Sequence, residues 1–422
     1  MAEANNKADH FVGVDLGGTK ILSGVFKNSL ECIGTSKLST KSQRGVDAVI
    51  ERIARSVQDA VDEADLNLKQ VAGIGIGAAG AVDFAEGRVI FAPNMEGWKD
   101  VPLKKDLEKL LGVPVFVEND CNICALGVHV TELKAKPRDL IGIFVGTGIG
   151  GGLIINGELY GGFNHTAGEI GHMVLDLNGP KCGCGNKGCF EALASRTAIF
   201  QQIKAGIKDG QKTILTEMLG DDLGDLRSGD LRKAIRRGDK FVARVVETAS
   251  EYIGIATANL FLNHGIIAYL QGQRYPRETF NADLNKVVTG LPLVVMVNRG
   301  TAGPAEIVAA AILENARGDV LGDKTFGVGS VQKVIEIPDG SALILSIAKY
   351  YTPAGKAIQD TAITPNILVA DNNDDFVLPD DDDNSGAPDQ PKKQRNLQND
   401  EQLKRAIEVL KNREAKVASA GK

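Results

Sequence analysis

The chain has 422 residues, a formal net charge of −6, 43% hydrophobic residues and 24% charged residues. This length and composition predict two to three domains with real hydrophobic cores, and the negative charge argues against nucleic acid as a partner. No apolar run approaches the roughly 18 residues of a membrane span, and no signal sequence precedes the first predicted strand. We therefore expect a cytoplasmic protein without a membrane partner, whose six cysteines stay reduced.

The first predicted strand, residues 11–15, runs into the turn Gly17-Gly18-Thr19, and further strands are predicted over 21–26 and 31–38. Glycines in such a turn leave backbone N–H groups bare, so that they can approach phosphate oxygens. Asp15, at the end of the first strand, is placed to hold Mg²⁺ directly or through water. An ordinary hairpin turn is the alternative for one such turn taken alone.

A core-facing helix is predicted over residues 46–61, where apolar residues recur at helical spacing. Further along, an apolar strand over 113–117 leads to Asn119 and Asp120, which precede a helical run. A carboxylate at this strand end can act as a base in a crevice, or it can cap the following helix, and both roles can hold at once.

A second glycine-rich turn is predicted over residues 146–152, between an apolar strand over 140–145 and a strand that resumes at 153–155. Two turns of this kind suit a triphosphate better than one. Neither turn is a Walker loop or a dinucleotide fingerprint, because each leads into a strand and not into a helix.

A metal site is predicted where His172 is followed by Cys182, Cys184 and Cys189. Zinc prefers four nitrogen or sulfur ligands in a tetrahedron, and these four residues supply a closed Cys3His set, which is typical of a structural metal. Buried or disulfide-paired cysteines are the alternative, but pairing two of the three would leave the third alone.

The remaining segments are predicted mainly from hydrophobic pattern. Helices are expected over 194–237 and 240–262, a disordered acidic linker over 371–396, and an amphipathic terminal helix over 401–417. Cys121 and Cys124 lie on the helix after Asp120, where we expect small packing residues and not metal ligands.

Several motifs stand together in a recognisable order. They are Asp15 to Lys20, Gly75 to Gly80, Pro93 to Trp98, Glu118 to Asp120, Gly146 to Gly152, Gly168 to His172 and Cys182 to Glu191. This set resembles the ROK family of sugar kinases and sugar-responsive regulators over about residues 10–260, and within it the bacterial glucokinases most closely. The resemblance implies an α/β, actin/hexokinase-like two-lobed fold with ribonuclease H-like lobes, which binds ATP, Mg²⁺, Zn²⁺ and a small-molecule sugar.

The resemblance also implies roles for individual residues. Asp120 would deprotonate the sugar hydroxyl. The residues expected to hold the other sugar hydroxyls are Asn94, Asn119, Glu169, His172 and Glu191. The residues expected at the phosphates of ATP are Asp15, Gly17, Gly18, Thr19, Lys20, Gly146, Thr147, Gly148 and Gly150. The family usually has Ala at position 121 and Glu at position 128, where this chain has Cys121 and Val128.

Two features bear on the branch of the family. The short stretch before Phe11 carries no helix-turn-helix pattern, so we expect a kinase and not a repressor. After Asn263, however, the chain lacks the family's expected adenosine-binding segment, so a non-catalytic sugar- or peptide-binding protein is the alternative.

Residues from about 265 to 365 resemble a fragment of the carboxyl-terminal processing (tail-specific) serine peptidases. In that family a Ser nucleophile and a Lys base stand where this chain has Gly303 and Val328. Neither residue can attack or accept a proton, so we expect a partial peptidase-like α/β module without peptidase activity.

These interpretations divide the chain into five parts. They are a first lobe over 1–118, a truncated second lobe with the zinc site over 119–262, a peptidase-like module over 263–370, a linker over 371–396 and a terminal helix over 397–422. A homo-oligomer is compatible with the sequence.

Overall fold

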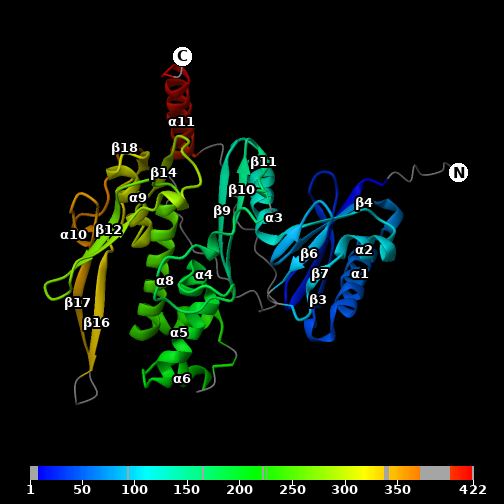
Figure 1. Cartoon of the computed structure of the whole chain (residues 1–422), viewed down its shortest axis with the longest axis horizontal. Coiled ribbons are helices and arrows are strands. Elements are labelled where there is room, and N and C mark those ends of the chain that lie inside the picture. Colours follow the sequence, from blue (N-terminus) through cyan, green and yellow to red (C-terminus); the bar gives the residue numbers. More distant parts are fainter. Residues whose placement is uncertain are drawn as a thin grey trace. The chain divides into compact units, whose positions relative to one another are not determined.

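The computed structural model describes residues 8–92, 95–163, 166–220, 223–224, 226–336, 342–370 and 400–420. The described residues form two compact units (Figure 1). The first unit comprises the chain through His172 together with Gly183–Gly185, and the second comprises Met173–Cys182 and the chain from Asn186 onward. The lobe boundary expected at residue 118 falls within the first unit and stays a prediction.

A five-stranded sheet forms the centre of the first unit, in the order β3-β2-β1-β4-β8. Its strands are β1 (His10–Leu16), β2 (Lys20–Phe26), β3 (Cys32–Ser39), β4 (Val71–Ala78) and β8 (Val115–Asn119). Strands β1, β4 and β8 run parallel, whereas β2 and β3 form an antiparallel meander with β1. The predicted hairpin and the predicted strand before Asp120 are thereby confirmed.

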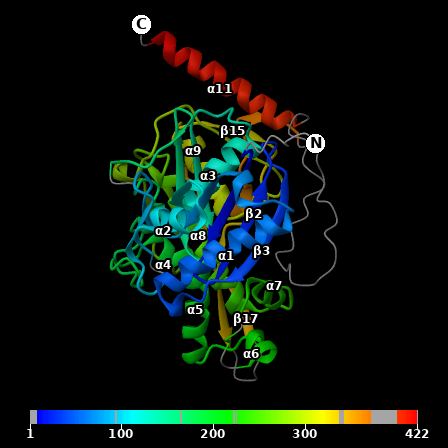
Figure 2. The same cartoon turned by 90° about the vertical axis from the view of Figure 1, so that its right-hand side faces the viewer.

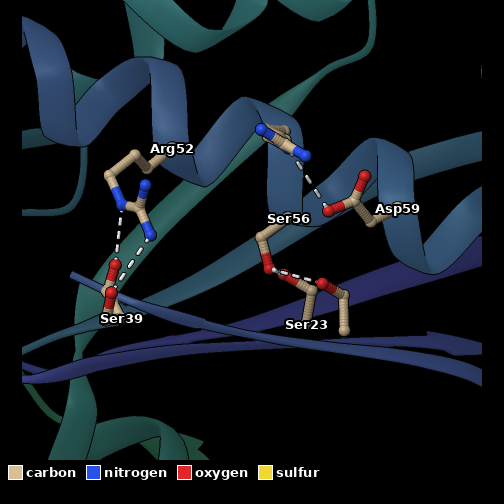
Figure 3. Close-up of polar contacts among 7 residues, drawn as sticks. Ser23, Ser39, Arg52, Ser56 and Asp59 are labelled. Atoms are coloured by element: carbon tan, nitrogen blue, oxygen red, sulfur yellow. Dashed lines mark hydrogen bonds and ion pairs between the residues drawn. The ribbon is translucent and has the colours of Figure 1, made fainter.

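Helix α1 (Val46–Glu63) packs on this sheet (Figure 2), as its apolar spacing predicts. Polar contacts fix its position: the Ser56 and Ser23 hydroxyls lie 2.8 Å apart, and the Arg52 Nε–H donates to the Ser39 carbonyl at 2.7 Å (Figure 3). The helix comes so close to β3 that a Cβ at Gly34 would lie 2.5 Å from the Ala60 carbonyl oxygen. Helix α2 (Leu103–Leu111) buries Leu103, Leu107 and Leu111 in the same core.

The rest of the first unit is built from short elements. A small sheet holds β5 (Ala81–Asp83), β6 (Arg88–Phe91) and β7 (Lys99–Val101), and another holds β9 (Leu140–Val145), β10 (Ile149–Ile155) and β11 (Glu158–Leu159). Helix α3 (Asp120–Gly127) passes into a π-helical turn, Val128–Glu132. The glycine turn predicted over 146–152 is too long, because β10 already begins at Ile149.

The second unit begins with helices and continues with sheets. The helices are α4 (Phe190–Ala194), α5 (Arg196–Lys208), α6 (Ile214–Leu219), α7 (Ser228–Arg236) and α8 (Lys240–Asn259). One sheet has the order β13-β12-β17-β16 and another, with parallel strands, the order β14-β15-β18. Their strands are β12 (Ile266–Gln271), β13 (Glu278–Asn281), β14 (Val294–Val297), β15 (Asp319–Gly322), β16 (Ser330–Glu336), β17 (Ala342–Tyr351) and β18 (Ile367–Leu368). Helices α9 (Pro304–Glu314) and α10 (Ile358–Thr361) lie between these strands in sequence.

Helix α8 belongs to two cores at once. Near its start, Val242 and Val245 pack with the apolar residues of α5 to α7. Near its end, Ile255 and Ala258 pack with β12 and α9 in a second apolar cluster. A Cβ at Gly254 would lie 2.7 Å from the Pro304 carbonyl oxygen, so α9 approaches the α8 backbone directly.

Side chains from the α9–β15 loop fix the segment that follows α8. The Asn315 Nδ2–H donates to the Ile266 carbonyl at 2.8 Å, and the Arg317 Nε–H donates to the Phe261 carbonyl at 2.8 Å. Within α8, burial raises the pKa of Glu251 to about 7, while a hydrogen bond from Tyr350 on β17 opposes that rise. The segment from Phe261 through β12 is therefore packed together with α8 and α9.

The terminal helix predicted from its amphipathic pattern is confirmed as α11 (Glu401–Ala420). It is anchored to the parallel sheet, since the Arg413 guanidinium lies 2.6 Å from the Asp319 carboxylate and the Gln402 amide donates to the Val369 carbonyl at 2.9 Å. The linker predicted over 371–396 lies outside the described residues. Among the helices that the structure describes, none has the length and apolar character needed to cross a membrane.

Candidate active site

Asp15 and Asp120 lie at the carboxyl edge of the parallel strands in the first unit. Asp15 in β1 pairs with Gly77 in β4, and Gly77 pairs with Glu118 in β8. The first turn of α3 packs on Gly77, since a Cβ there would lie 3.5 Å from the Asp120 Cα, an ordinary packing distance. The two carboxylates therefore flank one glycine, at the edge where ligands of open α/β sheets bind.

The two carboxylates also influence each other. The Asp15 side chain is accessible to solvent, but the surrounding protein removes part of the water around its carboxyl group. This partial burial raises the pKa of Asp15, and the negative charge of Asp120 raises it further. Like charges held this close favour the binding of a proton or a cation between them. A cation beside Asp15 would relieve this repulsion, and the Mg²⁺ role expected for Asp15 stays a prediction.

The position of Asp120 is set by its neighbours. Asn119, and not Asp120, is the N-cap of α3: the Asn119 Oδ1 accepts from the Asn122 N–H at 3.1 Å, and its Nδ2–H donates to the Gly80 carbonyl at 3.0 Å. The capping role considered for Asp120 is thus wrong, because Asp120 is the first residue of the helix. The Asn119 amide can still exchange a further hydrogen bond with a sugar hydroxyl.

Glu118 and Asn122 were missed as positioning residues. The Glu118 Oε1 accepts from the Asn119 N–H at 2.7 Å and from the Asn122 Nδ2–H at 3.1 Å. Asn122 is only 3% exposed, so this bond is shielded from water. The sequence signal was the pair of amides three residues apart at the start of a helix, which is typical of a capped turn.

The glycines of β10 bring two functional segments together. A Cβ at Gly150 would lie 2.4 Å from the Cys121 Sγ, and one at Gly152 would lie 2.6 Å from the Ala125 Cβ, so α3 packs on this face. A Cβ at Gly151 would lie 2.8 Å from the Gly168 carbonyl oxygen on the opposite face. Gly150, which the resemblance places at the phosphates, thus lies inside a strand and against Cys121.

The first glycine turn is held by a residue that the sequence did not suggest. The Gly17 N–H donates to the Lys20 carbonyl at 3.0 Å, and buried Thr40 donates its hydroxyl to the Gly17 carbonyl at 2.6 Å and its N–H to the Thr19 carbonyl at 2.8 Å. The side chains of Thr19 and Lys20 remain exposed.

The second turn is shorter. The Gly146 N–H donates to the Gly148 carbonyl at 2.9 Å, and both Gly146 and Thr147 are exposed. Both turns thus present backbone and short side chains at the ends of strands, as the sequence predicts.

The structure shows contacts for some of the predicted sugar-binding residues and only the position in the fold, or nothing, for the others. The His172 Nε2 lies 3.9 Å from the Glu169 Oε2, and each side chain is more than a third exposed. Burial and Asp120 raise the pKa of Cys121, and Glu169 adds to that effect, so the Glu169 charge lies within electrostatic reach of the first turn of α3. Glu191 lies in the first turn of α4 in the second unit, and Asn94 lies outside the described residues.

The predicted metal ligands lie together. One ligand atom each from His172, Cys182, Cys184 and Cys189 lies within 4.8 Å of all the others. A tetrahedral zinc ion with Zn–S bonds of about 2.3 Å needs sulfurs about 3.8 Å apart, so the set fits the ion. None of the six cysteines, all of which lie in the described part of the chain, takes part in a disulfide.

The metal loop depends on one glycine in particular. Gly188 has a φ of +64°, and a Cβ there would lie 1.5 Å from the Asp176 carbonyl oxygen. The Gly188 N–H donates to the Pro180 carbonyl at 2.8 Å and the Cys182 N–H to the Asn186 carbonyl at 2.8 Å, which closes the loop around the thiols. This cradle is what a zinc knot requires.

Gly303 and Val328, the positions at which the peptidase family has its nucleophile and its base, are bound by one side chain. The Gly303 N–H and the Val328 N–H both donate to the Glu306 Oε2, at 2.9 and 2.8 Å. Glu306 is fully buried, and its other oxygen accepts from the Gly327 N–H at 2.8 Å and from the Thr325 hydroxyl. A buried carboxylate therefore binds the backbone N–H groups of both positions, and neither position carries a nucleophile or a base.

Comparisons with known proteins identify two families along the chain. The ROK family model matches residues 11–266, and the model of Peptidase family S41 matches residues 252–369. A glucokinase from Halalkalibacterium halodurans is 35% identical over 251 residues, which are 59% of this chain and 76% of that protein. A putative xylose repressor from Caldicellulosiruptor sp. is 30% identical over 291 residues, 68% of this chain and 72% of that protein.

A solved structure shows a similar fold. The ROK family glucokinase from Streptomyces griseus, crystallised with glucose and AMPPNP, has a TM-score of 0.52 and 32% identity, covering 60% of this chain and 78% of that chain. The predicted actin/hexokinase-like α/β fold and the additional peptidase-like α/β module are therefore both confirmed. From its motifs, its fold and these matches, the chain belongs to the ROK family.

Proposed function

We propose that the chain is an ATP-dependent hexose kinase, similar to glucokinase, that transfers a phosphoryl group to the 6-hydroxyl of a sugar. The observation that carries this proposal is the pair Asp15 and Asp120 on either side of Gly77, at the carboxyl edge of three parallel strands. The two glycine turns supply the phosphate-binding backbone that such a reaction needs.

In this proposal Asp120 is the general base. Its Oδ1 accepts from the Cys121 N–H at 2.8 Å, which orients the carboxylate and leaves Oδ2 for the sugar hydroxyl. Removal of the hydroxyl proton makes the oxygen a better nucleophile as it attacks the γ-phosphorus in line. Mg²⁺ held by Asp15 would neutralise charge on the phosphate oxygens.

Sugar recognition would rest on carboxylates and amides. Asn94, Asn119, Glu169, His172 and Glu191 offer acceptors and donors that match hydroxyl groups, and a sugar that leaves one of them unpaired is rejected. The phosphates would contact Gly17, Gly18, Thr19 and Lys20 in one turn and Gly146, Thr147 and Gly148 in the other.

We also propose that His172, Cys182, Cys184 and Cys189 bind a structural zinc ion. The donor set is closed, with no position left for a substrate, so the ion would act through folding. By fixing His172 it would set one wall of the sugar site, because a metal ligand holds its ring in one orientation.

A non-catalytic sugar-binding protein is the second candidate. Two observations favour it: the family includes relatives described as repressors, and the chain continues after Asn263 with a segment similar to Peptidase family S41. A coupled assay with ATP, Mg²⁺ and a panel of hexoses separates the two candidates, since only a kinase consumes ATP in proportion to sugar.

The first prediction concerns the base. Asp120→Asn is expected to lower kcat by about 10²- to 10⁴-fold while sugar affinity changes little, because the amide keeps the shape of the carboxylate but accepts no proton. Turnover is measured in the coupled assay and sugar binding by calorimetry, with exposed Asp47→Asn on α1 as the matched control. Equal turnover by Asp120→Asn and the parent chain would remove Asp120 from the mechanism.

The second prediction concerns the metal. Protein purified without chelators is expected to hold about one zinc ion per chain, and Cys189→Ser is expected to lose it and to melt at lower temperature. Cys32→Ser, which removes an exposed thiol on β3, should keep both the zinc and the melting temperature. A parent protein that holds no zinc as purified, and whose melting temperature does not change when zinc is added, would contradict the proposed metal site.

The third prediction concerns the peptidase-like module. We expect no cleavage of an unstructured peptide tail, because Gly303 and Val328 carry no nucleophile or base and Glu306 occupies their N–H groups. The assay follows a fluorescent tail peptide by mass spectrometry. Cleavage that is lost on Thr301→Ala or Ser330→Ala would identify a nucleophile and overturn this assignment.

A further inference from the structure

Two thiols stand in the first turns of α3, directly after Asp120. Cys121 is half-buried, with its Sγ so close to β10 that a Cβ at Gly150 would lie 2.4 Å from it. Cys124, three residues on, is exposed to solvent. The kinase mechanism uses neither thiol, and the ROK-like pattern of this chain does not explain a cysteine at position 121.

We propose that Cys121 and Cys124 form a disulfide site that switches the enzyme off, an inference that rests on the proposed kinase function. On an α-helix, residues three apart have Cβ atoms about 5–6 Å apart, whereas a disulfide needs about 3.5–4.5 Å. Closing the bond therefore draws the two residues together by about 1–2 Å. The movement must come from the first turns of α3.

This movement would reach Asp120 through two contacts. The Cys121 N–H donates to the Asp120 Oδ1 at 2.8 Å, so a shift of the Cys121 backbone turns the carboxylate. The Cys121 Sγ must also leave its place against Gly150, which alters the seat of α3 on β10. A displacement of about 1 Å at a reacting group can cost about 100-fold in rate.

The short helix offers little resistance to this change. α3 has only eight residues, Asp120–Gly127, before the π-helical turn Val128–Glu132 begins, so few regular helical hydrogen bonds hold its first turns. Reduction would restore the original geometry, since no other covalent bond changes.

The oxidant is a small disulfide, such as glutathione disulfide. The Cys124 thiolate attacks one sulfur of this molecule, forming a mixed disulfide and releasing one glutathione thiolate. The Cys121 thiolate then attacks the Cys124 sulfur, forms the internal S–S bond and releases the second glutathione thiolate. Two protein thiols are oxidised, one small disulfide is reduced to two thiols, and the two protons pass to the released thiolates.

The surroundings of the thiols set the rate. Burial raises the pKa of Cys121 and of Cys124, and the charge of Asp120 raises both further. Asp15 adds to the effect on Cys124, and Glu169 adds to the effect on Cys121. Exchange is therefore slow at neutral pH and faster in mild alkali, where more thiolate is present.

The test uses the full zinc-loaded chain, incubated with glutathione disulfide at mildly alkaline pH. Trypsin releases the peptide Leu110–Lys134, which contains Cys121 and Cys124 and no other cysteine. We expect this peptide to lose two hydrogen atoms and to resist alkylation, while hexose phosphorylation falls about tenfold or more and returns with dithiothreitol. The Cys124→Ser variant should phosphorylate hexose equally well before and after treatment with glutathione disulfide. The Cys32→Ser control should lose activity on this treatment, as the parent does.

The outcomes separate the disulfide from the kinase. A peptide that still takes up two alkyl groups overturns the disulfide site, and a peptide that is oxidised without loss of phosphorylation overturns the switch. If the reduced chain phosphorylates no hexose, the proposed function fails, yet the peptide mass still decides whether the disulfide forms.

Discussion

The candidate site depends on the close approach of helix α3 to β10, a strand that has glycine where other residues would have side chains. The first turn of α3 packs on Gly77 of β4, and Gly150 and Gly152 let the flank of the helix lie on β10. Any Cβ at Gly150 or Gly152 would come within 2.4 to 2.6 Å of atoms of α3, a distance that packed atoms do not tolerate. Asp120 is the first residue of that helix, so the glycines determine where its carboxylate lies.

The same principle explains why the site has two kinds of glycine. The glycines of the turns at residues 17–18 and 146–148 expose backbone N–H groups at strand ends. The glycines of β10 have no side chain and therefore let neighbouring elements pack closely against the strand. Gly151 serves the opposite face, where the Gly168 segment leads to Glu169 and His172. One strand thus places the proposed base on one side and two proposed sugar ligands on the other.

Helix α8 explains how a kinase-like and a peptidase-like sequence share one compact unit. Its first half packs with α5 to α7, and its last turns pack with α9 and β12. The two family matches overlap over residues 252–266, which include the end of this helix and the segment that Asn315 and Arg317 hold. The peptidase-like module therefore supplies buried apolar surface to α8, a role that needs no catalytic dyad.

Much of the fold and the residue types of the site could be predicted from the sequence. Apolar periodicity identified the strands around Asp15 and Asp120 and the helix α1, and ligand spacing identified the Cys3His set. The contacts that position the site could not be predicted in this way, because Thr40, Glu118 and Asn122 act through partners that only the folded chain brings near them. The predicted length of the second glycine turn was wrong for a related reason, because glycine occurs both in turns and at tight packing contacts within strands. Only the pairing of β10 with β9 shows which of these glycines belong to a strand.

The packing of α3 on β10 can be tested directly by a double-mutant cycle at Gly150 and Cys121, read out as hexose phosphorylation. Gly150→Ala places a methyl group 2.4 Å from the Cys121 Sγ but 3.3 Å from its Cβ, so the clash is mainly with sulfur. We expect Gly150→Ala to lower kcat about tenfold or more, Cys121→Ala to stay close to the parent, and the double variant to recover most of the loss. A double variant as impaired as Gly150→Ala, or a Gly150→Ala variant as active as the parent, would contradict the claim that this contact sets the position of Asp120.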